Sequence, residues 1–137
     1  MVEKMTGGCQ CGEVRYEITG PPGRVHACHC TICQRQSGSA FGLTLWVTAE
    51  NFRIIHGEPA ATEWKSEAER DKLGAFCPDC GVRLYHRNQL TPETLSVKPG
   101  TLDDTSKLIA DLHIWTQHKQ PWITIPDGVE VYETQPD

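Results

Sequence analysis

The chain has 137 residues, of which 38% are hydrophobic and 23% charged, and this is enough for one globular domain with a buried core. Its formal net charge of −5 argues against nucleic acid or an anionic membrane as a partner. The sequence has no apolar run as long as a membrane span, and its first residues lack the apolar middle of a signal peptide. We therefore expect a cytoplasmic location.

The predicted elements are short. Residues 13–18 alternate Val14, Tyr16 and Ile18 with charged residues, which is typical of a strand with one buried face. The residues "TICQRQS" (31–37) form the best helix candidate, which Gly38 should end. Further strands are expected at 40–47, 52–55, 72–76, 82–86, 94–97 and 129–133. The sequence predicts one domain over residues 1–137, mostly β, with short antiparallel strands and little helix.

Seven cysteines are the most informative feature of the chain. An odd number would leave one thiol without a partner if the others formed disulfides, and disulfides are rare in reducing compartments. The cysteines are grouped as a Cys-x-Cys pair, a Cys-x-Cys-x2-Cys triplet and a Cys-x2-Cys pair, at positions 9, 11, 28, 30, 33, 77 and 80. Such groups indicate metal binding, with redox-active thiols as the alternative.

Spacing alone allows two ways to divide these cysteines. The glycine-flanked pairs "GGCQCGE" (7–13) and "FCPDCG" (76–81) could form one four-cysteine site, which leaves Cys28, Cys30 and Cys33. The pair Cys30 and Cys33 could instead combine with "FCPDCG" as in a zinc ribbon. The spacing does not decide between these two divisions.

Four segments together resemble a known family. The stretches "GGCQCGEVRYEI", "CHCTICQRQSGSAF", "FCPDCGVRLY" and "GTLDD" occur in this order between about Gly7 and Trp122. They are similar to the glutathione-dependent formaldehyde-activating enzymes, a family that shares its domain with the centromere protein V group. The resemblance implies an Mss4-like β-tent stabilised by zinc, with two Zn²⁺ ions per chain. It assigns a structural zinc to Cys9, Cys11, Cys77 and Cys80, and a catalytic zinc to Cys28, Cys30 and Cys33.

The family also implies a chemistry for the three-cysteine site. A catalytic zinc keeps one open position, and a site with three thiolates suits a soft sulfur ligand. The implied activity is that of a carbon–sulfur lyase, which forms S-hydroxymethylglutathione from glutathione and formaldehyde. The expected partners are thus a small thiol and an aldehyde, and the sequence identifies no substrate-binding residues.

Several alternatives remain open from the sequence. His26 or His29 could close the three-cysteine site, and the whole chain could be a non-catalytic, zinc-stabilised binding module. A methionine sulfoxide reductase is a weaker alternative, because no cysteine stands apart from the groups. Arg35 and Ser39 follow the triplet and could contact a ligand. The segment "HIWTQHKQPWI" (113–123) carries two tryptophans that belong either to the core or to a ligand cleft.

Overall fold

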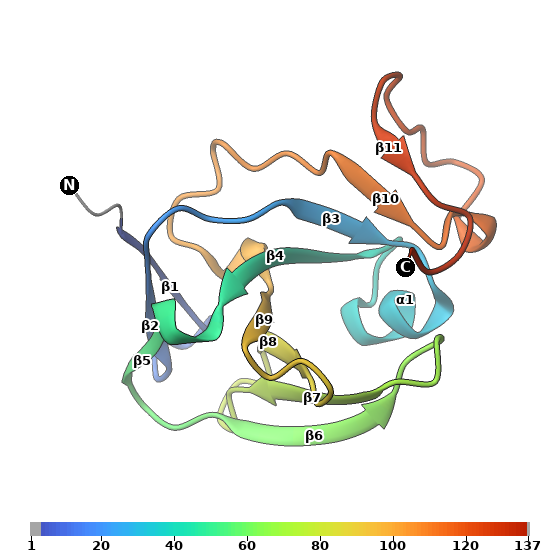
Figure 1. Ribbon diagram of the computed structural model, residues 1–137. Coiled ribbons are helices and arrows are strands. Elements are labelled where there is room, and N and C mark those ends of the chain that lie inside the picture. The colour runs from blue at the N-terminus through green and yellow to red at the C-terminus, as the bar shows by residue number, and fades with distance from the viewer. Residues whose placement is uncertain (1–3, 137) are drawn as a thin grey trace.

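The computed structural model describes residues 4–136, which form eleven strands in two sheets and one α-helix (Figure 1). The mostly β fold expected from the sequence is confirmed. The strands are β1 (Lys4–Gly8), β2 (Arg15–Thr19), β3 (Val25–Cys28), β4 (Gly42–Thr48), β5 (Phe52–His56), β6 (Ala60–Lys65), β7 (Asp71–Phe76), β8 (Arg83–Asn88), β9 (Thr94–Val97), β10 (Leu112–Ile114) and β11 (Glu130–Val131). The helix is α1 (Thr31–Ser37), and short 3-10 turns are η1 (Ala49–Asn51), η2 (Pro99–Thr101) and η3 (Thr116–His118).

The two sheets differ in size. The smaller has the order β1-β2-β5 and is antiparallel, and the larger has the order β11-β10-β3-β4-β9-β8-β7-β6. Strand β10 runs parallel to both β3 and β11, an exception to the mostly antiparallel pairing that the sequence predicts. The reason is the connection, because β10 reaches the edge of β3 after a long crossover segment rather than through a hairpin. No helix within residues 4–136 has the length and apolar character that a membrane span requires.

The sequence predicts some elements well and misses others. The helix occupies the expected residues and ends at Gly38, whose left-handed backbone gives a hydrogen bond to Gln34 O. Strands β1, β3, β6 and β10 are not predicted. The segment "VHAC" of β3 has four residues, all buried, and its one polar residue, His26, is too little to show the repeated apolar–polar alternation that would reveal a strand.

A core lies between the small sheet and one face of the large sheet. Val14, Tyr16 and Ile18, which the sequence predicts to be buried, are 0%, 0% and 1% exposed. Tyr16 stacks on Phe52, and its hydroxyl lies 2.7 Å from Thr101 Oγ1. The two sheets therefore share one hydrophobic core.

The other face of the large sheet is polar. In β3, β4 and β9 the apolar residues of the core alternate with polar or aromatic ones, as at Val25–His26–Ala27 and Leu45–Trp46–Val47. Because successive side chains of a strand point to opposite faces, these polar residues share one surface. Figure 1 shows β3 and β4 above, β6 and β7 below and β8 and β9 between them, with α1 at the open end. The polar face is thus the inner face of a bent sheet.

Candidate metal centres

Four cysteines from two turns that are distant in sequence come together in one cluster. The sulfur atoms of Cys9, Cys11, Cys77 and Cys80 all lie within 4.8 Å of one another. Cys9 and Cys11 follow β1, whereas Cys77 and Cys80 lie between β7 and β8. This cluster therefore connects the small sheet to the far part of the large sheet.

The two turns have the same backbone design. Gly12 N–H donates to Cys9 O in one turn, and Gly81 N–H donates to Cys77 O in the other, at 3.2 and 2.8 Å. Both glycines have φ near +80°, a conformation that a side chain would strain. The glycines that flank the cysteines in the sequence thus allow the backbone to turn back past the sulfur atoms.

The spacing of the sulfur atoms fits a tetrahedral metal site. Cys11 Sγ lies 3.6 Å from Cys9 Sγ and 3.8 Å from Cys77 Sγ. A tetrahedron of thiolates around Zn²⁺, with zinc–sulfur distances of about 2.3 Å, has sulfur–sulfur edges of about 3.8 Å. The N–H of Val14 also donates to Cys9 Sγ at 3.2 Å, and that of Val82 lowers the pKa of Cys80 to about 6. The backbone donors of the turns therefore favour the thiolate form that a metal requires, whereas burial and the neighbouring sulfur atoms raise the pKa of Cys11 to about 12.

The other three cysteines form a second cluster. The sulfur atoms of Cys28, Cys30 and Cys33 lie within 4.8 Å of one another, and the cluster includes no fourth His, Cys, Asp or Glu among residues 4–136. Cys28 ends β3, Cys30 is the N-cap of α1, and Cys33 lies in its first turn. The N–H of Cys33 donates to Cys30 Sγ at 3.3 Å. Hydrogen bonds from Cys28 and Cys33 lower the pKa of the Cys30 thiol to about 3.

His29 does not complete this cluster. Its side chain is fully buried, packs against Phe41 and has Nε2 2.8 Å from His113 Nδ1. The ring therefore belongs to a separate pair of histidines beside the cluster. His26 lies elsewhere, on the same face of β3 as Cys28, but the cluster does not include it.

The three-cysteine cluster lies at a cavity of about 110 Å³ that the polar face of the large sheet encloses. All three cysteines line it together with Ile32 and Gln36 of α1. The polar face supplies the opposite walls through residues on six strands and one residue just after β9, namely His26, Thr44, Trp46, Trp64, Lys72, His86, Asn88, Ser96 and Lys98. The four-cysteine cluster contributes no residue to these walls.

The cavity is more positive than the chain as a whole. Its walls carry the cations of Arg70, Lys72 and Lys98 and the carboxylate of Glu67. Burial lowers the pKa of Lys72 and Lys98, and the thiols of the cluster act in the opposite direction. Lys98 Nζ donates to Leu43 O at 3.2 Å. The cations oppose the negative charge that three thiolates and an anionic ligand would bring into the cavity.

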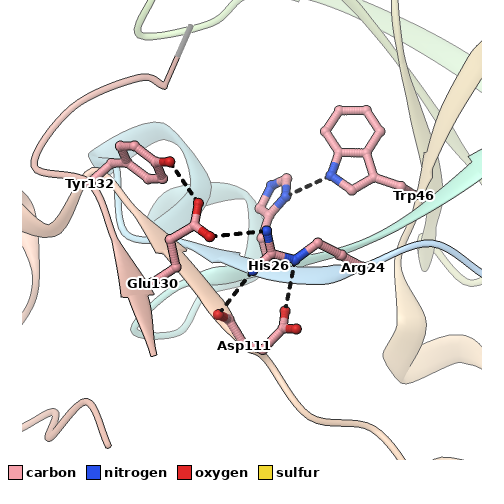
Figure 2. Close-up of polar contacts among 6 residues, drawn as sticks. All are labelled: Arg24, His26, Trp46, Asp111, Glu130 and Tyr132. Atoms are coloured by element: carbon pink, nitrogen blue, oxygen red, sulfur yellow. Dashed lines mark hydrogen bonds and ion pairs between the residues drawn. The ribbon is translucent and has the colours of Figure 1, made fainter. Parts of the chain in front are cut away.

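The histidines of the cavity are neutral. Burial lowers the pKa of His26 to about 4 and that of His86 to about 2. Trp46 Nε1–H donates to His26 Nδ1 at 3.0 Å, as Figure 2 shows, and Arg83 Nη1 lies 2.9 Å from His86 Nε2. Indole and guanidinium groups only donate, so each of these ring nitrogens is an acceptor.

The C-terminal segment completes the rim of the cavity. Trp115 Nε1–H donates to Gln135 Oε1 at 3.0 Å, and both residues line the cavity. Figure 2 shows how the segment is held at β11, where Arg24 contacts Asp111 and Glu130, each at 3.3 Å, and Tyr132 OH donates to Glu130 at 2.6 Å. These contacts hold the start of the segment whose Gln135 lines the cavity together with the cysteines.

The other residues singled out in the sequence have different positions. Arg35, Ser39 and Trp122 line a separate hollow on the outer side of α1, so they are not part of the cavity. Of the two tryptophans near the C-terminus, Trp115 lines the cavity and Trp122 is 72% exposed. Lys72, His86 and Lys98 are cavity residues that the sequence does not indicate. Their alternation with apolar neighbours could have suggested a shared face, but not that this face is enclosed.

The fold and the two clusters define a cysteine-rich β protein with two groups of side chains that can hold metal. Residues 4–118 match the family described as glutathione-dependent formaldehyde-activating enzyme. The chain belongs to this family, as its cysteine segments suggest.

Two similar proteins add detail. A Penicillium rubens protein, provisionally named a glutathione-dependent formaldehyde-activating enzyme, is 31% identical over 81 residues, which are 58% of this chain and 41% of the fungal protein. The matched region therefore spans less than half of that relative. The crystal structure of a Rhodobacter sphaeroides protein has a TM-score of 0.58 and 21% identity, covering 75% of this chain and 92% of that one. This second similarity concerns the fold alone.

Proposed function

We propose that the chain is a zinc-dependent carbon–sulfur lyase that joins glutathione and formaldehyde reversibly as S-hydroxymethylglutathione. The observation that carries this proposal is the three-cysteine cluster, whose sulfur atoms line a cavity without a fourth protein ligand among the described residues. The family match and the name of the fungal relative support glutathione and formaldehyde as the substrates.

The proposal assigns two Zn²⁺ ions to one domain of residues 1–137. Cys9, Cys11, Cys77 and Cys80 would hold a structural ion, and Cys28, Cys30 and Cys33 a catalytic one. A zinc ion bound by three thiolates supplies a position for a further thiol and lowers the pKa of that thiol. The shared hydrophobic core of the two sheets supports the assignment of a single domain.

The protein's own side chains would bind and orient the substrate. Lys72 and Lys98 would offset the charge of the substrate thiolate and of the cysteine ligands, which is otherwise costly in a partly buried cavity. Trp64 and Trp115 would exclude water from the sulfur atoms. The reaction adds a thiol RSH to H₂C=O and gives RS–CH₂–OH, so no electron acceptor or further reactant is needed.

The test must measure rates, because formaldehyde and thiols also combine without an enzyme. We expect the zinc-loaded protein to accelerate the exchange of formaldehyde between its hydrated form and S-hydroxymethylglutathione, as measured by magnetisation-transfer NMR at equilibrium. Cys33→Ser should remove this acceleration while the protein stays folded. A wild-type protein that holds both metals and leaves the exchange rate unchanged would instead be a zinc-stabilised binding module.

A further inference from the structure

We propose that His26 donates a hydrogen bond from Nε2 to the oxygen of the thiol–aldehyde adduct, with Trp46 holding it in the tautomer that can do so. This inference rests on the proposed function, because it concerns the substrate oxygen in the same cavity. Nothing in the sequence pattern of the cysteines points to His26 in this role.

The first argument is the position of His26 in the sheet. His26 and Cys28 are two residues apart on β3, so their side chains point to the same face, and both line the cavity. Two residues of extended strand span about 6–7 Å. A sulfur ligand beside the three cysteines would therefore bring its attached carbon, and the oxygen on that carbon, to the part of the cavity that His26 lines.

The second argument is the hydrogen bond with Trp46. The indole N–H can only donate, and it lies 3.0 Å from His26 Nδ1 (Figure 2). Nδ1 must then carry a lone pair, so the proton of the imidazole is on Nε2. The geometry alone thus assigns the tautomer, in the way that a partner at one ring nitrogen usually fixes the other.

The third argument is that Nε2 is free to bind. Among residues 4–136 no hydrogen bond satisfies His26 Nε2, although the residue is only 8% exposed. Within the described residues, His29 Nδ1 and Arg87 Nε are the unpaired side-chain atoms that are fully buried. His26 Nε2 is unpaired but is not among them, so a molecule in the cavity can reach it. An unpaired donor on a residue that lines the cavity is available to an acceptor on a bound ligand.

The carbonyl oxygen of formaldehyde is such an acceptor. When the thiolate sulfur forms the carbon–sulfur bond, the π electrons of C=O move to the oxygen, which then takes up the proton that the thiol released. A donor placed at this oxygen stabilises the charge that develops in the transition state. In the reverse direction the same hydrogen bond favours the departure of the thiolate.

Lys98 differs from His26 in a way that can be tested. Its Nζ already donates to Leu43 O, and its charge acts on any anionic ligand, with or without an oxygen next to the sulfur. His26 should discriminate between ligands by that oxygen alone. Two small thiols separate these roles: thioacetate, in which one carbon carries both sulfur and oxygen, and ethanethiol, which lacks the oxygen.

The experiment uses the full chain with Co²⁺ in place of Zn²⁺ and follows the sulfur-to-cobalt charge-transfer band as each thiol is added. We expect His26→Phe to weaken thioacetate binding about tenfold, the effect of one hydrogen bond to a charged acceptor, and to change ethanethiol binding less than twofold. His26→Gln, which can place an N–H near the position of Nε2, should recover most of the affinity. Lys98→Met should weaken both thiols.

A second readout does not depend on binding. In ¹⁵N NMR of the wild-type protein, His26 Nε2 should have the shift of a protonated ring nitrogen and Nδ1 that of an unprotonated one. Trp46→Phe should move both toward a mixture of tautomers. A wild-type spectrum with the proton on Nδ1 overturns the inference, even if His26→Phe does not fold.

The remaining outcomes are also decisive. Equal weakening of both thiols by His26→Phe, or no change for either, overturns the inference, and so does a wild-type protein that binds neither. Selective loss of thioacetate supports it even where glutathione and formaldehyde exchange no faster than in buffer. In that case the proposed reaction fails, while the contact between His26 and a substrate oxygen stands.

Discussion

The two cysteine clusters use the same ligand atom in opposite surroundings. The four-cysteine cluster joins two turns that are far apart in sequence, with Cys11 exposed, and it lines no part of the cavity beside the other three cysteines. The three-cysteine cluster comes from one short segment, residues 28–33, with Cys28 and Cys30 buried at the cavity. A metal ion in the first cluster would crosslink distant parts of the chain, and its removal would release a long loop. A metal ion in the second would add little to the connectivity, so one ligand position could stay open there.

The largest expected effect breaks the first cluster. Cys80→Ser should leave the chain unfolded at room temperature, so that no cooperative melting transition is seen. The reason is that zinc binding, worth roughly 10–16 kcal/mol in small zinc peptides, contributes directly to the free energy of folding. Circular dichroism melts and elemental analysis check this result. Cys33→Ser is the matched variant, and it should remain folded with one zinc ion per chain. If Cys33→Ser unfolds and Cys80→Ser does not, the two roles are assigned in reverse.

Metal removal should separate the clusters next. The wild-type protein from zinc-rich medium should contain two zinc ions per chain, and a chelator should remove one of them at least about tenfold faster. The three-cysteine site has fewer protein ligands and faces the cavity, so its ion should leave first. A colorimetric zinc indicator follows both phases. A single phase for both ions would contradict the division into four and three ligands.

A smaller effect should come from the charge of the cavity. Lys98→Met should weaken glutathione binding about tenfold, since it removes a cation near the cysteines, and should leave the melting temperature unchanged or higher. Burial already lowers the pKa of Lys98, which means that the fold opposes its charge. Titration of the cobalt-loaded protein measures the affinity. Lys65→Met, at an exposed ion pair with Asp71, is the control and should leave binding unchanged.

The clusters also show which features of the fold and of the metal sites can be predicted from the sequence. Short spacings and flanking glycines describe local turns, so α1, the Cys-x2-Cys turn and the buried face of β2 could be predicted. The Cys-x-Cys pair after β1 meets the Cys-x2-Cys pair after β7 because of how these strands are arranged in space. The spacing of cysteines along the sequence does not contain that information. The family resemblance implied a division that the spacing alone left open.

The cavity could not be predicted from the sequence, for a related reason. His26, Lys72, His86 and Lys98 lie up to 72 positions apart in the sequence, and each alone is typical of a solvent-facing residue. They become neighbours only because cross-strand pairs such as His86 with Ser96 align on one face. Bending of the eight-stranded sheet then encloses this face. Strand order and curvature are tertiary features that no window of the sequence displays.

The smallest predicted effect concerns pH and the cavity wall. Burial lowers the pKa of His86 from 6.5 to about 2. Below pH 6.5, His86 therefore stays neutral in the folded protein but is protonated in the unfolded chain. Since the unfolded state then binds more protons, stability falls as pH falls below that value. One such histidine should cost about 1 kcal/mol between pH 6.5 and pH 5.5, or about 4 °C in melting temperature. Above pH 7 the contribution should be constant.

His86→Gln isolates this contribution, because glutamine does not titrate and can still accept the hydrogen bond from Arg83. Acid also protonates the cysteines, but both proteins keep all seven, so the difference between their melting curves cancels that loss of metal. The wild-type protein should lose the additional 4 °C relative to His86→Gln over this interval. The exposed His56→Gln serves as the control and should follow the wild type. A constant difference between wild type and His86→Gln from pH 7 to pH 5.5 would mean that His86 takes up a proton inside the folded cavity, and the wall beside the cysteines would then be as hydrated as the outer surface.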